Sequence, residues 1–231
     1  MKLCIGTVSA RGDVRIEYVQ GLVGILQECA ALGIETSFLQ FTGALVEDAR
    51  NMMASHFLQG DGQALLMLDD DIFLDRRVFK RILGVQRGIV GCYYPQRALS
   101  MEGFAEKIRA GMGTREAAEA ANPLVGPDPD IAADLDLTEV EWIGSGALLI
   151  RRPALMRMIE CGQVTKERFR TPQDRAEIWG FFSRLQLGDG IARSEDVSFC
   201  LRARQSGIPV YAYKGPGVLH SGSYQFGQHL R

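Results

Sequence analysis

The first 95 residues alternate between short apolar runs and segments with helical spacing, and this alternation constrains the fold more than any other feature. The short segments that suit strands are residues 3–8, 36–41, 64–68 and 89–93. The intervening segments that suit helices are residues 15–32, 47–58 and 75–85. Strands separated by helices of this length favour right-handed crossovers. We therefore predict an α/β fold with a mostly parallel sheet and helices on both faces.

The pattern changes after residue 97. Residues 98–138 hold a Gly-rich helical piece and a Pro-rich stretch, and we expect a variable loop there. The next predicted strand runs from Val140 to Ile150, and a second irregular stretch covers residues 163–193. The remaining predicted elements are helices at 153–161 and 195–205 and a strand at 210–213. With 231 residues and no linker, the chain should form a single domain, 1–231.

Composition and charge exclude several classes of protein. The formal net charge is -2 at pH 7, so the chain lacks the basic excess typical of proteins that hold duplex DNA through its phosphates. Its 5 cysteines include no C-x-x-C pair, which favours reduced thiols over a disulfide framework. The sequence shows no signal-peptide pattern and no apolar run long enough to span a membrane. We expect a cytoplasmic protein without an integral membrane segment.

Three aspartates, Asp69, Asp70 and Asp71, directly follow the apolar run at residues 64–68. Open parallel sheets bind ligands at the carboxyl ends of their strands. Adjacent carboxylates repel one another unless a cation neutralises them, and Mg²⁺ and Mn²⁺ prefer oxygen ligands. The triplet therefore predicts a metal site, at which a bound cation would bridge to a diphosphate. The alternative is an acidic turn that caps the next helix.

Six segments of the chain, in their order and spacing, resemble the glycosyltransferase A fold and in detail its family 2-like enzymes from bacteria and their phages. These segments are residues 48–51, 69–71, 89–95, 142–152, 194–200 and 219–226. The resemblance implies a Rossmann-like domain whose nucleotide-sugar-binding half is about residues 1–97 and whose acceptor and catalytic half is about residues 139–231. The sequence departs from the family pattern at residues 98–138, which match nothing in it, and at Asp70, the middle residue of the D-x-D motif.

The resemblance also implies the residues of a metal site for Mn²⁺ or Mg²⁺. Asp71 would ligate the metal, and Asp69 would face the ribose or contact the metal through water. Asp70 is ambiguous, because its side chain would point either into the site or away from it. His220 would complete the site, since imidazole is an acceptable ligand for Mn²⁺. Without the resemblance, a lone histidine is more typical of a hydrogen-bonded structural residue.

Two further residues are expected on the donor side by the same resemblance. Thr7, at the end of the first predicted strand, would lie near the base or ribose. Arg50, on the second predicted helix, would reach the nucleotide or brace the metal-binding loop. The alternative for Arg50 is an ordinary surface cation on a helix.

Candidate residues for the sugar and acceptor pocket lie in the fourth segment. They are Trp142, Gly144, Ser145 and Gly146. Glycines within a strand allow a ligand to approach the backbone closely, although a bulge or crowded packing requires them as well. The aromatic run at residues 179–182 would form either a lid that stacks on a sugar or a hydrophobic cluster, and the sequence does not separate the two.

The catalytic base is expected in the pair Glu195 and Asp196, which follows Ser194 at the start of a predicted helix. Inversion at a sugar carbon needs a base that removes the proton of the acceptor hydroxyl. In enzymes of the family that this chain resembles, an acidic pair at this position supplies the base, so we assign Asp196 first and Glu195 second. Acidic residues also cap helices, and capping alone is the alternative.

Together these features predict a metal-dependent inverting glycosyltransferase that uses a nucleotide-diphosphate sugar, with a UDP-sugar as the expected donor. The acceptor stays open among a glycan, a protein, a lipid and a modified nucleobase of phage DNA. One alternative is a sugar-phosphate nucleotidyltransferase, although residues 9–13 only faintly resemble its Gly-rich loop. A second alternative, from a different class, is a non-catalytic nucleotide-sugar-binding module.

Overall fold

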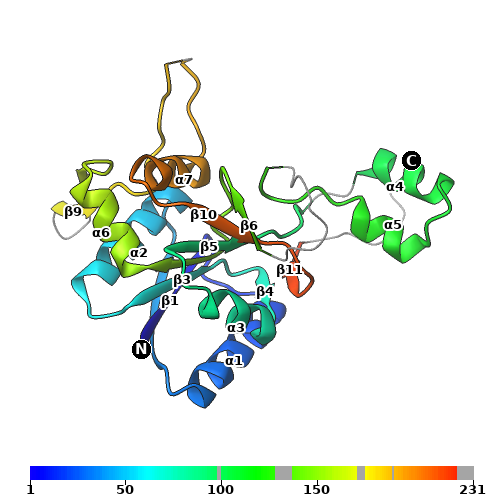
Figure 1. The fold of residues 1–231 in the computed structure, drawn as a ribbon, viewed down its shortest axis with the longest axis horizontal. Helices are drawn as coiled ribbons and strands as arrows, with labels where there is room; N and C mark the ends of the chain where they lie inside the picture. The colour runs from blue at the N-terminus through cyan, green and yellow to red at the C-terminus, as the bar shows by residue number, and fades with distance from the viewer. Residues whose placement is uncertain (98–99, 128–136, 171–174, 189, 223–231) are drawn as a thin grey trace.

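The computed structural model describes the chain except for residues 98–99, 128–136, 171–174, 189 and 223–231. Its described residues build a central 7-stranded sheet with the strand order β2-β1-β3-β7-β5-β10-β6 (Figure 1). The strands of this sheet are β1 (Lys2–Ser9), β2 (Glu35–Thr42), β3 (Ala64–Leu68), β5 (Ile89–Cys92), β6 (Leu137–Val140), β7 (Ala147–Arg151) and β10 (Val210–Tyr213). Strands β1, β2, β3, β5 and β10 share one direction, whereas β7 and β6 run antiparallel to their neighbours. The predicted mostly parallel α/β sheet is confirmed.

Helices cover both faces of the sheet. They are α1 (Ile16–Ala31), α2 (Val46–Gln59), α3 (Arg76–Gly84), α6 (Arg152–Glu160) and α7 (Glu195–Gln205). Buried side chains of α1 and α3 join one hydrophobic core, and those of α2, α6 and α7 join the other. Strand β3 serves both cores, because Leu66 and Leu68 point to the first and Leu65 and Met67 to the second. All five residues of β3 are buried, so this central strand fixes the position of the aspartates that follow it.

The predicted strand from Val140 to Ile150 is wrong. The structure has two strands there, β6 and β7, and Gly144, Ser145 and Gly146 lie in the connection between them. Strand β7 inserts antiparallel between β3 and β5, with Ala147 opposite Leu68. Apolar periodicity alone did not reveal the break, because residues 143–150 are all buried whether or not they pair in a sheet.

Four short strands were not predicted. They are β4 (Ile72–Leu74), β8 (Lys166–Arg170), β9 (Arg175–Trp179) and β11 (Val218–His220). Strands β8 and β9 form a hairpin within the stretch expected to be irregular. Strands β4 and β11 pair antiparallel in a separate two-stranded sheet, with Ile72 opposite His220. The second pairing matters for the site, because it brings the chain after the aspartates beside the chain near the carboxyl end.

The segment expected as a variable loop contains two short helices, α4 (Met101–Arg109) and α5 (Thr114–Ala120). They pack on each other and project away from the sheet (Figure 1). Helix α4 buries none of its residues, which explains why apolar periodicity was weak here. Among the described helices, none is both long enough and apolar enough to cross a membrane.

Candidate active site

The aspartate triplet and the β6–β7 connection meet at one edge of the sheet. The Asp69 backbone N–H donates to the Gly146 carbonyl at 2.9 Å, which continues the pairing of β3 with β7 by one residue. A Cβ atom built on Gly146 would lie 2.8 Å from the Tyr94 hydroxyl oxygen and 3.1 Å from Asp69 Oδ2. Glycine is therefore required at this position by crowded packing, which was one of the two readings of this segment.

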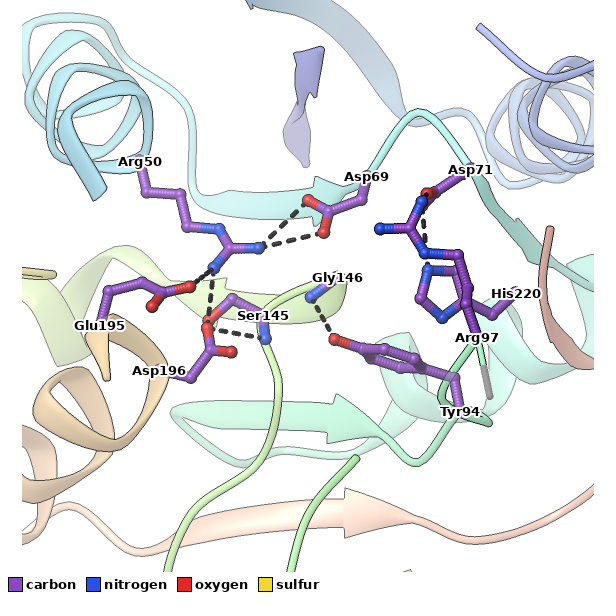
Figure 2. Close-up of polar contacts among 10 residues, drawn as sticks. All are labelled: Arg50, Asp69, Asp71, Tyr94, Arg97, Ser145, Gly146, Glu195, Asp196 and His220. Carbon is purple, nitrogen blue, oxygen red and sulfur yellow. Dashed lines mark hydrogen bonds and ion pairs between the residues drawn. The ribbon is translucent and has the colours of Figure 1, made fainter. Parts of the chain in front are cut away.

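Arg50 lies at the centre of a cluster of three carboxylates (Figure 2). Its Nη1 donates to Glu195 Oε1 at 2.7 Å and to Asp196 Oδ1 at 2.8 Å, and its Nη2 donates to Asp69 Oδ2 at 3.0 Å. The Arg50 side chain is only 4% exposed, so the alternative of a surface cation is wrong. Burial opposes the charge on Arg50, but the three carboxylates outweigh it and raise the pKa of the guanidinium.

The acidic pair at the start of α7 does not serve as the helix cap. Ser194 is the N-cap residue, and its hydroxyl accepts a hydrogen bond from the Val197 N–H at 3.4 Å. The Glu195 and Asp196 side chains point instead toward Arg50 (Figure 2). Asp196 Oδ1 also accepts from the Ser145 N–H at 3.1 Å. Asp196 is thus held from two sides, by the guanidinium and by the chain that leads into β7.

A second group of charges surrounds Asp71. His220, the last residue of β11, lies opposite Ile72 in β4, and its Nε2 is 3.3 Å from Asp71 Oδ1. Arg97 donates from Nη1 to the other oxygen, Asp71 Oδ2, at 2.8 Å. Burial would raise the pKa of Asp71, but the hydrogen bond and charge of His220 and the charge of Arg97 outweigh burial and lower it.

His220 is held in an orientation suited to a metal ligand. Its Nδ1 lies 2.8 Å from the Pro95 carbonyl oxygen, which only accepts hydrogen bonds, so Nδ1 carries the proton. In the neutral ring the lone pair is then on Nε2, the nitrogen that faces Asp71. Burial lowers the pKa of His220, but the contacts with Asp71 and with the Pro95 carbonyl outweigh burial and raise it. The ring also packs edge-on against Tyr94, with centroids 5.4 Å apart.

An open cavity of about 320 Å³ adjoins Asp70 and Asp71. Its other lining residues are Ala10, Arg11, Asp13, Val14, Arg15 and Arg97. Residues 10–15 follow β1, and Arg97 follows β5, so both segments reach the cavity from the carboxyl ends of strands. The lining therefore combines three guanidiniums, which suit phosphate groups, with three carboxylates, which suit a cation.

Sequence reasoning missed Arg97, Tyr94 and the arginines of the β1–α1 loop as site residues. Tyr94 lies in the segment that carries the family resemblance, and its hydroxyl accepts from the Gly146 N–H at 3.2 Å. Burial raises its pKa, and the charges of Asp69 and Asp196 add to the shift. Arg11 belongs to residues 9–13, which only faintly resemble a Gly-rich phosphate-binding loop, and Arg15 is the first residue of the predicted helix at 15–32. Their positions in the sequence do not identify them as site residues, because the shape of the loop decides where the two side chains point.

Several predicted site residues lie elsewhere than expected. Thr7 is 1% exposed and its hydroxyl is 2.6 Å from the Tyr18 hydroxyl, so it faces the packed interior rather than a nucleotide. Asp69 contacts Arg50 rather than the pair of Asp71 and His220. Asp70 faces the cavity beside Asp71, and burial raises its pKa.

The predicted floor of the sugar pocket is also largely interior. Gly144, Ser145 and Gly146 are buried, and Trp142 is half-buried against the core. Two residues of the aromatic run also lie in the interior, because Phe181 and Phe182 are fully buried and Phe182 stacks on Phe199 of α7. These side chains form part of the hydrophobic core, so the alternative of an aromatic lid is wrong for both phenylalanines. The Ser223–Phe226 end of the family resemblance lies outside the described residues.

The acidic triplet is not the cap of the next helix. Strand β4 separates it from α3, and Asp75 caps that helix by accepting from the Arg77 N–H at 2.7 Å. Among the described residues, no group of three or more His, Cys, Asp or Glu side chains is arranged to hold a metal ion. The pair of Asp71 and His220 nevertheless fits a Mn²⁺ or Mg²⁺ site of the kind that takes its other ligands from substrate phosphates and water.

Comparisons with known proteins give similar folds but no family. No family model and no curated protein match the chain. Among solved structures, it is similar to A197 from STIV, with 17% identity and a TM-score of 0.48 over 93% of this chain and 82% of that one. A UDP-glucose pyrophosphorylase complexed with UDP-glucose matches with 8% identity and a TM-score of 0.47 over 94% and 91%.

Glycosyltransferases are also among the similar structures. The Drosophila β-1,4-galactosyltransferase 7 in complex with manganese, UDP-Gal and xylobiose matches with 13% identity and a TM-score of 0.42. That match covers 93% of this chain but only 65% of the galactosyltransferase. Identities and TM-scores this low give no information about the activity of this chain.

Proposed function

We propose that the chain is a metal-dependent inverting glycosyltransferase that moves a sugar from a nucleotide-diphosphate sugar, with a UDP-sugar as the expected donor, to an acceptor hydroxyl. One observation carries the proposal. Arg50 joins Asp69, at the end of the central strand, to Glu195 and Asp196 on α7, so a donor-side carboxylate and a candidate base share one buried cation. A buried cluster of this kind is not needed to cap a helix or to form a network of salt bridges on the surface.

The donor site would lie in the cavity beside Asp70 and Asp71. Arg11 and Arg15 would bind phosphate oxygens, since planar guanidiniums recognise phosphates with paired hydrogen bonds. Asp71 and His220 would hold Mn²⁺ or Mg²⁺. When bound, the metal would neutralise the charge that develops on the departing diphosphate.

The base would be Asp196. Its Oδ1 is held by Arg50 and by the Ser145 N–H, and we assign the acceptor proton to Oδ2. Arg50 Nε and Ser145 Oγ are buried without a hydrogen-bond partner among the described residues. Buried polar atoms without partners are unusual away from functional sites or bound water.

A sugar-phosphate nucleotidyltransferase is the second candidate, and the arginines of the β1–α1 loop favour it. Arg11 and Arg15 reach the cavity directly after β1, where such enzymes bind the phosphates of a nucleoside triphosphate. The carboxylate pair Glu195 and Asp196 favours the glycosyltransferase instead, because transfer of a nucleotidyl group to a sugar phosphate needs no base for a hydroxyl.

Product analysis separates these candidates. With a panel of UDP-sugars and Mn²⁺, we expect slow release of UDP and free sugar when water replaces the acceptor, and loss of this release on chelation with EDTA. With UTP and sugar 1-phosphates, we expect no pyrophosphate. Pyrophosphate formation would establish the nucleotidyltransferase. Binding of UDP-sugars without turnover in either assay, and with every acceptor class supplied, would favour a binding module.

A further inference from the structure

The two oxygens of the Asp71 carboxylate contact side chains of very different exposure. His220 lies near Oδ1, and Arg97 contacts Oδ2 (Figure 2). The side chains of Asp71 and His220 are 14% and 13% exposed, whereas that of Arg97 is 56% exposed. His220 is fixed by the Pro95 carbonyl and the Tyr94 ring. Arg97 alone of these three can leave the carboxylate without uncovering buried surface.

Arg97 and a divalent cation compete for the same carboxylate. Arg97 Nη1 donates to Asp71 Oδ2 at 2.8 Å, and a metal between Asp71 Oδ1 and His220 Nε2 would use the other oxygen of this group. Two cations of combined charge +3 on one carboxylate repel each other strongly. Metal binding at Asp71 therefore favours the departure of Arg97.

The cavity gives Arg97 a second partner. Arg97 lines it together with Arg11 and Arg15, so its guanidinium lies between the metal-site carboxylate and the space where phosphates would bind. Asp13 and Asp70 also line this cavity, but a diphosphate carries more negative charge than either carboxylate and accepts paired hydrogen bonds from a guanidinium.

We propose that Arg97 is an exchangeable counterion, which neutralises Asp71 in the metal-free protein and moves to the diphosphate of the nucleotide when the metal binds. This inference rests on the proposed function and adds to it an order of events. Metal alone binds weakly, because Arg97 must give up the Asp71 carboxylate and finds only the single carboxylates of Asp13 and Asp70 in the cavity. Metal and nucleotide together bind cooperatively, because the nucleotide accepts the displaced guanidinium.

The test compares R97Q with a matched control, R11Q. Both remove one positive charge from an exposed residue of the same cavity, but the structure places only Arg97 on Asp71. Titration of Mn²⁺ alone, followed by electron paramagnetic resonance of the free ion, should show roughly 3- to 10-fold tighter binding by R97Q and no more than about 2-fold change in R11Q. With saturating Mn²⁺, calorimetry should show UDP binding weakened by about 10-fold in both variants.

Either of two results overturns the exchange. The first is that R97Q binds Mn²⁺ no more tightly than the wild type does. The second is that the Mn²⁺ affinity of R11Q rises as much as that of R97Q, because the change would then reflect net charge alone. Equal thermal unfolding midpoints for the three proteins establish that folding is unchanged. Failure of the proposed function has a different signature, because wild-type protein would then bind UDP equally well with and without Mn²⁺.

Discussion

Replacing Arg50 with Met is expected to lower the free energy of unfolding by about 3–5 kcal/mol near pH 7.5, because it leaves three converging carboxylates without their shared cation. Met keeps the length and apolar character of the side-chain stem, so the loss reports the charge rather than a cavity. Denaturant unfolding, monitored by circular dichroism, measures the difference. The effect is large because the Arg50 side chain is 4% exposed and water does not replace the lost ion pairs.

The salt dependence of this loss separates the charge cluster from ordinary packing. As the salt concentration rises from about 0.1 M to about 1 M, ions screen the repulsion among the carboxylates that the variant leaves without a cation, so the deficit should shrink. Arg202 provides a matched control, since it is also buried but donates to the carbonyls of Gln163, Phe181 and Ser183. R202M should lose stability by an amount that is nearly constant over the same range. A deficit in R50M that is equally constant would contradict the assignment of a charge cluster.

Replacing Asp196 with Asn should reduce sugar transfer by about 10²- to 10⁴-fold while leaving UDP binding unchanged. Asn retains an oxygen that can accept from the Ser145 N–H and from Arg50, so the position of the side chain should be preserved. What it loses is the ability to accept a proton. Steady-state turnover with a UDP-sugar, with donor affinity measured separately by calorimetry, distinguishes the two effects.

The matched variant for Asp196 is E195Q. Glu195 shares the contact with Arg50 but is not held by the Ser145 N–H, so its loss should reduce turnover far less. If E195Q loses activity by the larger factor and D196N retains it, Glu195 is the base. If both variants turn over at nearly the wild-type rate, the pair is structural and the inverting mechanism assigned to it is wrong.

The sequence predicts most regular elements of the first half, because β1, β3 and β5 are short apolar runs bounded by a polar turn or a helix. Strand β3, followed by the three aspartates, is the clearest case, and its bounds of Ala64–Leu68 match the prediction. The antiparallel insertion of β7 could not be read from periodicity, since a strand buried on both faces has the same apolar pattern in either direction. The helices α4 and α5 were missed as separate elements because α4 buries no side chain.

The site itself was predicted in parts rather than as an arrangement. The sequence identifies Asp71, His220, Glu195 and Asp196 by their likeness to family segments, and the structure brings them into two charge clusters at one sheet edge. It does not reveal that Arg50 binds three carboxylates, because those partners are up to 146 residues apart in the chain. Nor does it reveal Arg97, whose role depends on the loop after β5 and carries no spacing signal.

Calorimetric titration of UDP with and without Mn²⁺ tests the claim of a metal-dependent nucleotide-diphosphate site at Asp71. The wild-type protein should bind UDP with at least about 10-fold higher affinity in the presence of Mn²⁺, and D71N should lose this gain. Binding of UDP that is indifferent to Mn²⁺, or a gain that persists in D71N, would contradict the claim.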